Sequence, residues 1–88
     1  MTWRIDFTRT AEKQIAKLDR PSQARILSYL RRRVLACENP RQLGKALHGD
    51  KQGLWRHRVG KSRIICDIQD DGSTVLVLAV AHRKDVYR

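Results

Sequence analysis

The spacing of apolar residues changes once along this chain, and that change limits the folds open to it. Up to residue 37 the apolar residues recur mostly every three or four positions, as on a helix, apart from a short alternating run near the N-terminus. After residue 53 the runs 54–59, 63–69 and 74–81 are rich in β-branched residues and follow the period of a strand. The sequence therefore predicts an α+β domain with its helices in the first half.

The first half of the chain predicts one strand followed by two helices. Residues 3–7 alternate apolar and polar side chains, which is typical of a strand with one buried face. A short helix follows, capped by Thr8 or Thr10, and a second helix is expected to begin at Pro21 and to end at Asn39. The buried face of the first helix is predicted to hold Ala11, Ile15 and Leu18. The buried face of the second is predicted to hold Ala24, Leu27, Leu30, Val34 and Cys37.

Three strands are predicted after a glycine-rich loop. The loop covers residues 39–53 and is long enough to invite a functional explanation. Gly60–Ser62 and Asp70–Ser73 are turn sequences, so the three runs form two hairpins in series. The last run, 74–81, is apolar on both faces and is expected to be the central strand. Residues 1–88 are thus predicted to form a single domain, in which a helical hairpin packs on a mostly antiparallel four-stranded sheet in the order β-α-α-β-β-β.

The charge of the chain predicts a polyanionic partner. There are 19 Lys and Arg against 9 Asp and Glu, a formal charge of +10, which is more than solubility requires of so short a chain. The basic residues occur in both halves, so the folded surface itself is expected to be positive and to bind nucleic acid rather than a membrane or an acidic protein. Cys37 and Cys66 have no metal-binding or redox spacing. Neither a leader peptide nor a membrane-spanning segment is expected from the apolar pattern. We expect a protein of the reducing cytoplasm.

The strand predicted directly after the loop carries the most specific candidate site. Alternation puts Arg56 and Arg58 on one face, about 7 Å apart, which suits neighbouring phosphates of an extended single strand. Hairpin pairing can bring Arg63 and Arg83 into the same patch, and Tyr87 can stack on an unpaired base there. The plain alternatives are a solvated strand face and a C-terminal ring that only packs on the domain.

The remaining polar residues point away from metal chemistry. His48, His57 and His82 lack the spacing of metal ligands, so no metal or other cofactor is expected. Arg31–Arg33 is more typical of a solvated helix face than of a contact. RNA strand cleavage needs no metal and no protein nucleophile, because the substrate's own 2′-hydroxyl can attack the adjacent phosphate. The protein must supply cations, a proton acceptor and a proton donor, for which arginines, a tyrosine and a histidine are enough.

Two segments resemble those of a known toxin family. Gly53–Ile65 resembles the Leu-Trp-Arg-x-Arg-Val-Gly-x-x-Arg segment of RelE-type toxins, and Ala81–Arg88 resembles their closing Gly-His-Arg-Arg-x-Val-Tyr-Arg. The predicted order of strands and helices is also similar to the RelE/ParE fold over nearly the whole chain. The resemblance implies a toxin of a type II toxin–antitoxin system.

The resemblance also implies a role for each candidate residue. Arg56 and Arg58 match basic positions, often lysines, that contact the substrate and of which one is linked to proton abstraction. Arg63 and Arg83 match arginines that hold and neutralise the scissile phosphate, and Tyr87 matches the tyrosine that stacks on or orients the nucleotides. Since arginine stays protonated near neutrality, Arg56 and Arg58 are expected to act as electrostatic clamps.

The proton acceptor and the aromatic lining are where this chain departs from the family. Histidine side chains can exchange a proton near neutral pH, and His82 stands beside Arg83, so it is the alternative acceptor. Tyr87 and a group of the ribosome are further candidate acceptors. The favoured alternative has no discrete base and relies on charge around the phosphate. Ser62 and Cys66 occupy positions where family members often carry tyrosine, which is expected to thin the aromatic lining of the site.

The resemblance favours one function over two others. It implies a ribosome-dependent endoribonuclease that cleaves mRNA in the ribosomal A site and so inhibits translation. A cognate antitoxin with an acidic or amphipathic segment is the expected protein partner, and direct DNA binding is not expected without it. The alternative is a ParE-like inhibitor of DNA gyrase without RNase activity, but Arg56, Arg63, Arg83 and Tyr87 favour the nuclease. A plain nucleic-acid-binding module would explain the charge but not the two motifs.

Overall fold

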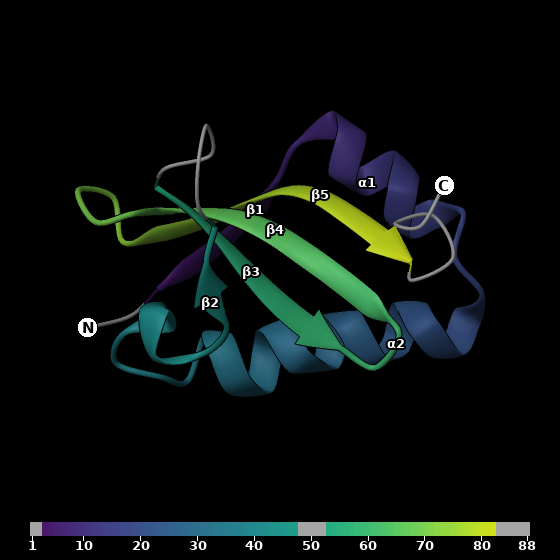
Figure 1. Ribbon diagram of the computed structural model, residues 1–88, viewed down its shortest axis with the longest axis horizontal. Helices are drawn as coiled ribbons and strands as arrows, with labels where there is room; N and C mark the ends of the chain where they lie inside the picture. Colours follow the sequence, from purple (N-terminus) through teal and green to yellow (C-terminus); the bar gives the residue numbers. More distant parts are fainter. Residues whose placement is uncertain (1–2, 48–52, 83–88) are drawn as a thin grey trace.

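The computed structural model describes residues 3–47 and 53–82, and within this part of the chain two helices pack on a five-stranded sheet (Figure 1). The helices are α1 (Arg9–Ala16) and α2 (Arg20–Tyr29). The strands are β1 (Arg4–Phe7), β2 (Lys45–Ala46), β3 (Leu54–Val59), β4 (Ser62–Gln69) and β5 (Thr74–His82). They lie in the order β1-β5-β4-β3-β2, in which β1 and β5 are parallel and the other pairs antiparallel. The predicted α+β class and the mostly antiparallel sheet are confirmed.

Among the described residues the sheet has five strands, one more than the four that the sequence predicted. Residues 45–46 form β2, a two-residue strand on the outer side of β3, and Pro40–Gln42 form a 3₁₀ turn. The segment predicted as a loop therefore contains regular structure, although a strand of two residues has no period by which a sequence could reveal it. The run predicted to be central, β5, lies inside the sheet between β1 and β4, but β4 holds the middle place.

Helix α1 is fixed to β5 by two polar side chains. The Thr8 hydroxyl caps the helix by accepting from the Ala11 amide at 3.1 Å, and it donates to the Leu78 carbonyl at 2.9 Å. Further along α1, the side-chain oxygen of Gln14 accepts from the Val80 amide at 2.7 Å. Since β1 pairs with β5 only up to residue 77, Gln14 replaces a strand partner beyond that point.

Helix α2 and the turn after it bury part of the predicted face, since Leu30 and Val34 are buried as predicted and Cys37 is half-buried. The helix continues into a π-helical turn, Leu30–Val34, in which the Leu35 amide donates to the Leu30 carbonyl at 3.0 Å. Ala24 and Leu27 were expected inside but are exposed, Leu27 by 41%. The buried side chains of this segment are Ile26, Leu30 and Val34.

The sheet has one face against the helices and one face away from them. Alternate residues of β4 are buried on the helix face, and the residues between them are half-buried. In Figure 1, α2 runs alongside the sheet near β3 and β4, while α1 lies next to β5. We call the opposite side the open face. None of the helices in the described residues is long and apolar enough to span a membrane. The helix face of the sheet, with Trp3 directly before β1, contributes these side chains to the buried interior: Trp3, His57, Ser62, Ile64, Cys66, Ile68, Val75, Val77 and Val80.

Candidate functional site

Three arginines meet on the open face of the sheet. Arg58 of β3 lies directly opposite Arg63 of β4, and cross-strand partners share a face. Arg56 is two residues away on the same strand, opposite Ile65, so it projects from the same face. His57 between them is fully buried on the helix face, as the predicted alternation requires. We call Arg56, Arg58 and Arg63 the arginine cluster.

A fourth cation, which the sequence did not point to, extends the arginine cluster. Lys45 of β2 is the cross-strand partner of Arg56, and a hollow of about 280 Å³ is lined by Gly44, Lys45, Arg56 and Arg58. Gly44 has a φ of +78°, and a side chain there would collide with the Arg56 carbonyl oxygen. The glycine therefore lets the chain approach β3 closely enough to bring Lys45 alongside.

The charges of these four cations are not balanced within the described residues. The ion pairs found there, Arg4 with Asp6 and Arg41 with Asp70, involve none of the four. Like charges directly opposite each other, as in Arg58 and Arg63, destabilise a strand pair. An anion bound between them would remove that repulsion, so the cluster is suited to phosphate.

The surface beside the arginine cluster is apolar and partly made of small side chains. In β5, Ala81 lies opposite Arg63, and Ala79 lies opposite Ile65. Alanines in these positions leave room above the sheet for a flat or bulky ligand group next to the guanidinium groups. The site can therefore offer charge for a phosphate and apolar surface for a base or a sugar.

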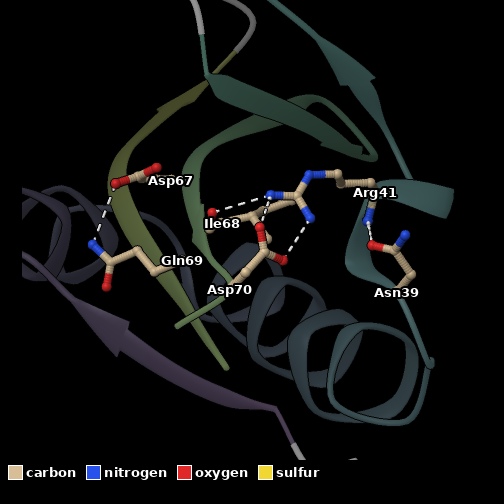
Figure 2. Close-up of polar contacts among 6 residues, drawn as sticks. All are labelled: Asn39, Arg41, Asp67, Ile68, Gln69 and Asp70. Carbon is tan, nitrogen blue, oxygen red and sulfur yellow. Dashed lines mark hydrogen bonds and ion pairs between the residues drawn. The ribbon is translucent and has the colours of Figure 1, made fainter. Parts of the chain in front are cut away.

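The far end of the sheet carries carboxylates, which limit the extent of the basic surface. Figure 2 shows Asp67 and Gln69 on one side of β4 and the Arg41–Asp70 pair on the other. Arg41 binds both carboxylate oxygens of Asp70, at 2.9 and 2.8 Å, and the Ile68 carbonyl at 3.3 Å. The hydrogen bonds of this pair raise the pKa of Arg41 and lower that of Asp70. Arg41 thus joins the 3₁₀ turn to the β4–β5 hairpin.

His82 is not brought to the arginine cluster. It is the cross-strand partner of Ser62, which is buried on the helix face, whereas Arg63 projects from the open face. The pKa of Asp19, the cap of α2, is lowered mainly by hydrogen bonds from Ser22 and to a smaller extent by the charge of His82. His82 therefore lies on the α2 side of the sheet.

The two positions at which RelE-type toxins often carry tyrosine, Ser62 and Cys66, also face the helices. Ser62 is 3% exposed and Cys66 is fully buried, so neither lines the open face, and the expected thinning of an aromatic lining was wrong for both. Burial raises the pKa of the Cys66 thiol to about 12, which makes it a poor nucleophile. Arg83 and Tyr87 lie outside the described residues. Arg31–Arg33 is exposed in the π-helical turn, as expected of a solvated helix face.

Comparison with known proteins identifies the family of this chain. Residues 5–87 match the family described as the ParE toxin of the type II toxin–antitoxin system parDE. The chain belongs to this toxin family. The toxin is 31% identical to Toxin RelG of Mycobacterium tuberculosis, over all of this chain and 99% of that relative. It is 29% identical to Toxin RelE of the same organism, over 98% of this chain and 87% of that relative.

Solved structures support the same relationship. The toxin superposes with a TM-score of 0.86 and 28% identity on the toxin–antitoxin complex RelBE2 from M. tuberculosis, covering 94% of this chain and 100% of that chain. The isolated E. coli RelE toxin, at 19% identity, shares the fold with a TM-score of 0.72 over 97% of this chain and 90% of that one. The resemblance to RelE-type toxins is confirmed: this chain is a toxin of the RelE/ParE superfamily, from a type II toxin–antitoxin system.

Proposed function

We propose that this toxin is a metal-independent endoribonuclease that cleaves mRNA in the ribosomal A site and so stops translation. The observation that carries the proposal is the arginine cluster with Lys45 beside it, four cations on one open sheet face without a carboxylate partner among the described residues. Such a surface fits the phosphates of a single strand laid across β3 and β4. The similarity to Toxin RelG and Toxin RelE supports the same reading.

The proposed reaction uses the substrate's own nucleophile. The 2′-hydroxyl oxygen attacks the adjacent phosphorus while the bond from phosphorus to the 5′ oxygen breaks. The products are a 2′,3′-cyclic phosphate and a 5′-hydroxyl, and the proton lost by the 2′ oxygen is balanced by the one gained by the 5′ oxygen. Negative charge builds on the phosphate oxygens during this step, and cations held in place beforehand stabilise it most where it is greatest.

Each candidate residue has a role in this proposal. Arg56 and Arg58 clamp neighbouring phosphates, and Arg63 stabilises the charge on the scissile one. Arg83 is assigned to the same phosphate and Tyr87 to stacking or orienting the nucleotides, on the family resemblance alone. His82 lies on the helix face, which favours the mechanism without a general base from the protein. In that mechanism the cations lower the activation barrier of cleavage by their charge alone.

A cognate antitoxin is the proposed protein partner. The RelBE2 structure is a toxin–antitoxin complex, and the E. coli RelE toxin has likewise been solved with its antitoxin. The +10 charge of this toxin predicts an acidic or amphipathic antitoxin segment that covers the arginine cluster or displaces the segment ending at Tyr87. Hydrogen exchange of the complex should show protection in one of these regions. Both its substrate and its antitoxin would place the toxin in the cytoplasm.

The decisive experiment maps RNA ends. Purified toxin is incubated with translating ribosomes on a defined mRNA, with the naked mRNA, and in parallel with DNA gyrase. We expect new 5′ ends on the ribosome-bound mRNA and few on the naked one. Arg63→Gln should lower the cleavage rate by about 100-fold or more. Arg4→Gln is the matched control, because Arg4 is an exposed sheet arginine that already pairs with Asp6.

The outcomes separate the three functions. Inhibition of gyrase without new RNA ends would favour the ParE-like alternative. RNA binding without RNA cleavage and without gyrase inhibition would indicate a plain nucleic-acid-binding module. Equal cleavage by wild type and Arg63→Gln would remove the arginine cluster from the mechanism.

A further inference from the structure

A buried histidine lies directly between the two clamp arginines. His57 is fully buried, while its chain neighbours Arg56 and Arg58 project from the open face. His57 is therefore one peptide unit from each arginine, so a shift of the β3 backbone at His57 would displace both. The proposed function gives this ring no task.

Two other segments hold the His57 ring. The Tyr29 hydroxyl lies 3.0 Å from Nδ1, and the two rings meet edge to face with their centroids 5.7 Å apart. Tyr29 is the last residue of α2, directly before the π-helical turn. A Cβ on Gly44 would also lie 3.0 Å from this Nδ1, so the backbone leading into β2 passes close to the ring. His57 thus connects α2, β3 and the segment that carries Lys45.

The ring is buried at a cost that an apolar side chain would avoid. Its Nε2 atom is buried and has no hydrogen-bond partner among the described residues. A buried polar atom without a partner destabilises a protein by a sizeable part of its desolvation energy. A protonated imidazole would fare worse, since both ring nitrogens would then carry a hydrogen to donate, and burial accordingly lowers the pKa of His57.

We propose that Tyr29 and His57 form a positioning pair for the arginine cluster, which holds β3 in place while the imidazole is neutral and releases it when the imidazole is protonated. The proposal rests on the proposed function in one respect, namely that the arginines bind RNA. His57 touches no substrate in it and acts only through Arg56 and Arg58.

The charged and titratable groups around the pair offer no compensation for a proton on His57. The positive charge of Arg33, from the π-helical turn, acts on Tyr29, as do the thiols Cys66 of β4 and Cys37. On β3 itself the flanking groups are Arg56 and Arg58, and no carboxylate of the described residues forms an ion pair with His57. The contribution of the pair is therefore complete above the ordinary histidine pKa of 6.5 and is lost as pH falls below it.

The test measures binding of a single-stranded RNA whose 2′-hydroxyls are methylated, so that it cannot be cut. The variants are His57→Asn, which keeps a polar atom for the Tyr29 hydroxyl but cannot take a proton, and His57→Leu, which loses both properties. Thr74→Val is the control for loss of a buried polar group elsewhere in the sheet. Thermal unfolding at pH 7.5 verifies that each variant is folded.

The expected change of RNA affinity with pH is opposite to the usual one. Acid normally strengthens RNA binding to a basic protein by adding positive charge. We expect the wild-type affinity instead to fall by about tenfold between pH 7.5 and 5, and that of His57→Asn to stay level or rise. His57→Leu should bind about tenfold more weakly already at pH 7.5, while Thr74→Val binds like wild type. Affinities that rise alike with acid in wild type and His57→Asn, or unchanged binding by folded His57→Leu, would overturn the proposal.

A second readout keeps the proposal separate from the proposed function. If wild type binds no RNA at any pH, the proposed function fails, but the guanidinium resonances of Arg56 and Arg58 still report on their surroundings by NMR. They should shift with the titration of His57 in wild type and not in His57→Asn. Resonances that ignore the titration of His57 would refute the positioning pair.

Discussion

Replacing Arg58 by glutamine should make the toxin more stable and a weaker RNA binder at the same time. Arg58 is exposed and directly opposite Arg63, with no carboxylate paired to either among the described residues. Two like charges in this arrangement repel each other in the free protein and attract the same phosphate in the complex. Glutamine keeps most of the side-chain length and removes the charge, so it separates the two effects.

The size of the effect follows from the cross-strand geometry. Like charges on directly opposite residues of a strand pair repel by about 0.5–1 kcal/mol at the protein surface. In a domain of this size, 0.5 kcal/mol corresponds to a rise in Tm of about 2–4 °C. Loss of one phosphate contact should weaken binding of single-stranded RNA by about tenfold at low salt and lower the salt slope by about 0.7.

The assay is thermal unfolding of wild type and Arg58→Gln at about 20 mM and 1 M salt, with RNA binding measured over the same series. High salt shortens the screening length to about 3 Å, so the stability gain should disappear there. Arg4→Gln is the matched control, since it removes an attractive pair with Asp6 at 3.3 Å and should gain nothing. A Tm for Arg58→Gln below that of wild type at low salt would refute the repulsion, and undiminished RNA binding would refute the phosphate contact.

Three further predictions test other parts of the structure. Arg41→Ala should lower Tm by on the order of a few degrees at pH 7. Because Arg41 lowers the pKa of Asp70, the pair stabilises the fold at pH values above the ordinary aspartate pKa. The Tm values of wild type and variant should therefore converge as pH falls to about 2. Ile26→Ala should cost about 2–5 kcal/mol in chemical denaturation and Leu27→Ala less than about 1 kcal/mol, and equal costs would contradict the buried face of α2. His82→Gln should leave cleavage within about threefold of wild type at every pH, whereas a pH-dependent loss of about 100-fold would make His82 the base.

The strands and the arginine face could be predicted because alternation encodes both. Residues two positions apart on a strand lie on the same face of the sheet. Once residues 54–59 are a strand, Arg56 and Arg58 must therefore project from one face. The tight turn at Gly60 then brought Arg63 directly across from Arg58. These relations are local, and they need no knowledge of what packs beneath the sheet.

Features set by contacts distant in the sequence could not be predicted. Lys45 joins the arginine cluster through a strand of two residues, whose place depends on the close approach of Gly44 to β3. The buried face of α2 includes Ile26, four residues before Leu30, whereas the spacing of three had selected Leu27. The π-helical turn that follows α2 was not predicted either. Neither a short edge strand nor a π turn leaves a period in the sequence.

The face of His82 depends on a single irregularity in β5. Simple alternation from the buried Val75 and Val77 would put residues 79 and 81 on the helix face and His82 on the open face with the arginines. The register between β4 and β5 shifts at Ile65/Cys66, so that one residue of β5, Leu78, has no cross-strand partner. Beyond this bulge the two faces exchange: Ala81 lies beside Arg63, and His82 faces α2 with Ser62. Thr8 holds the Leu78 carbonyl at the bulge, so the start of α1 helps to decide which β5 side chains adjoin the arginine cluster. A small alanine there, in place of a titratable ring, agrees with a site that works by positioning and charge.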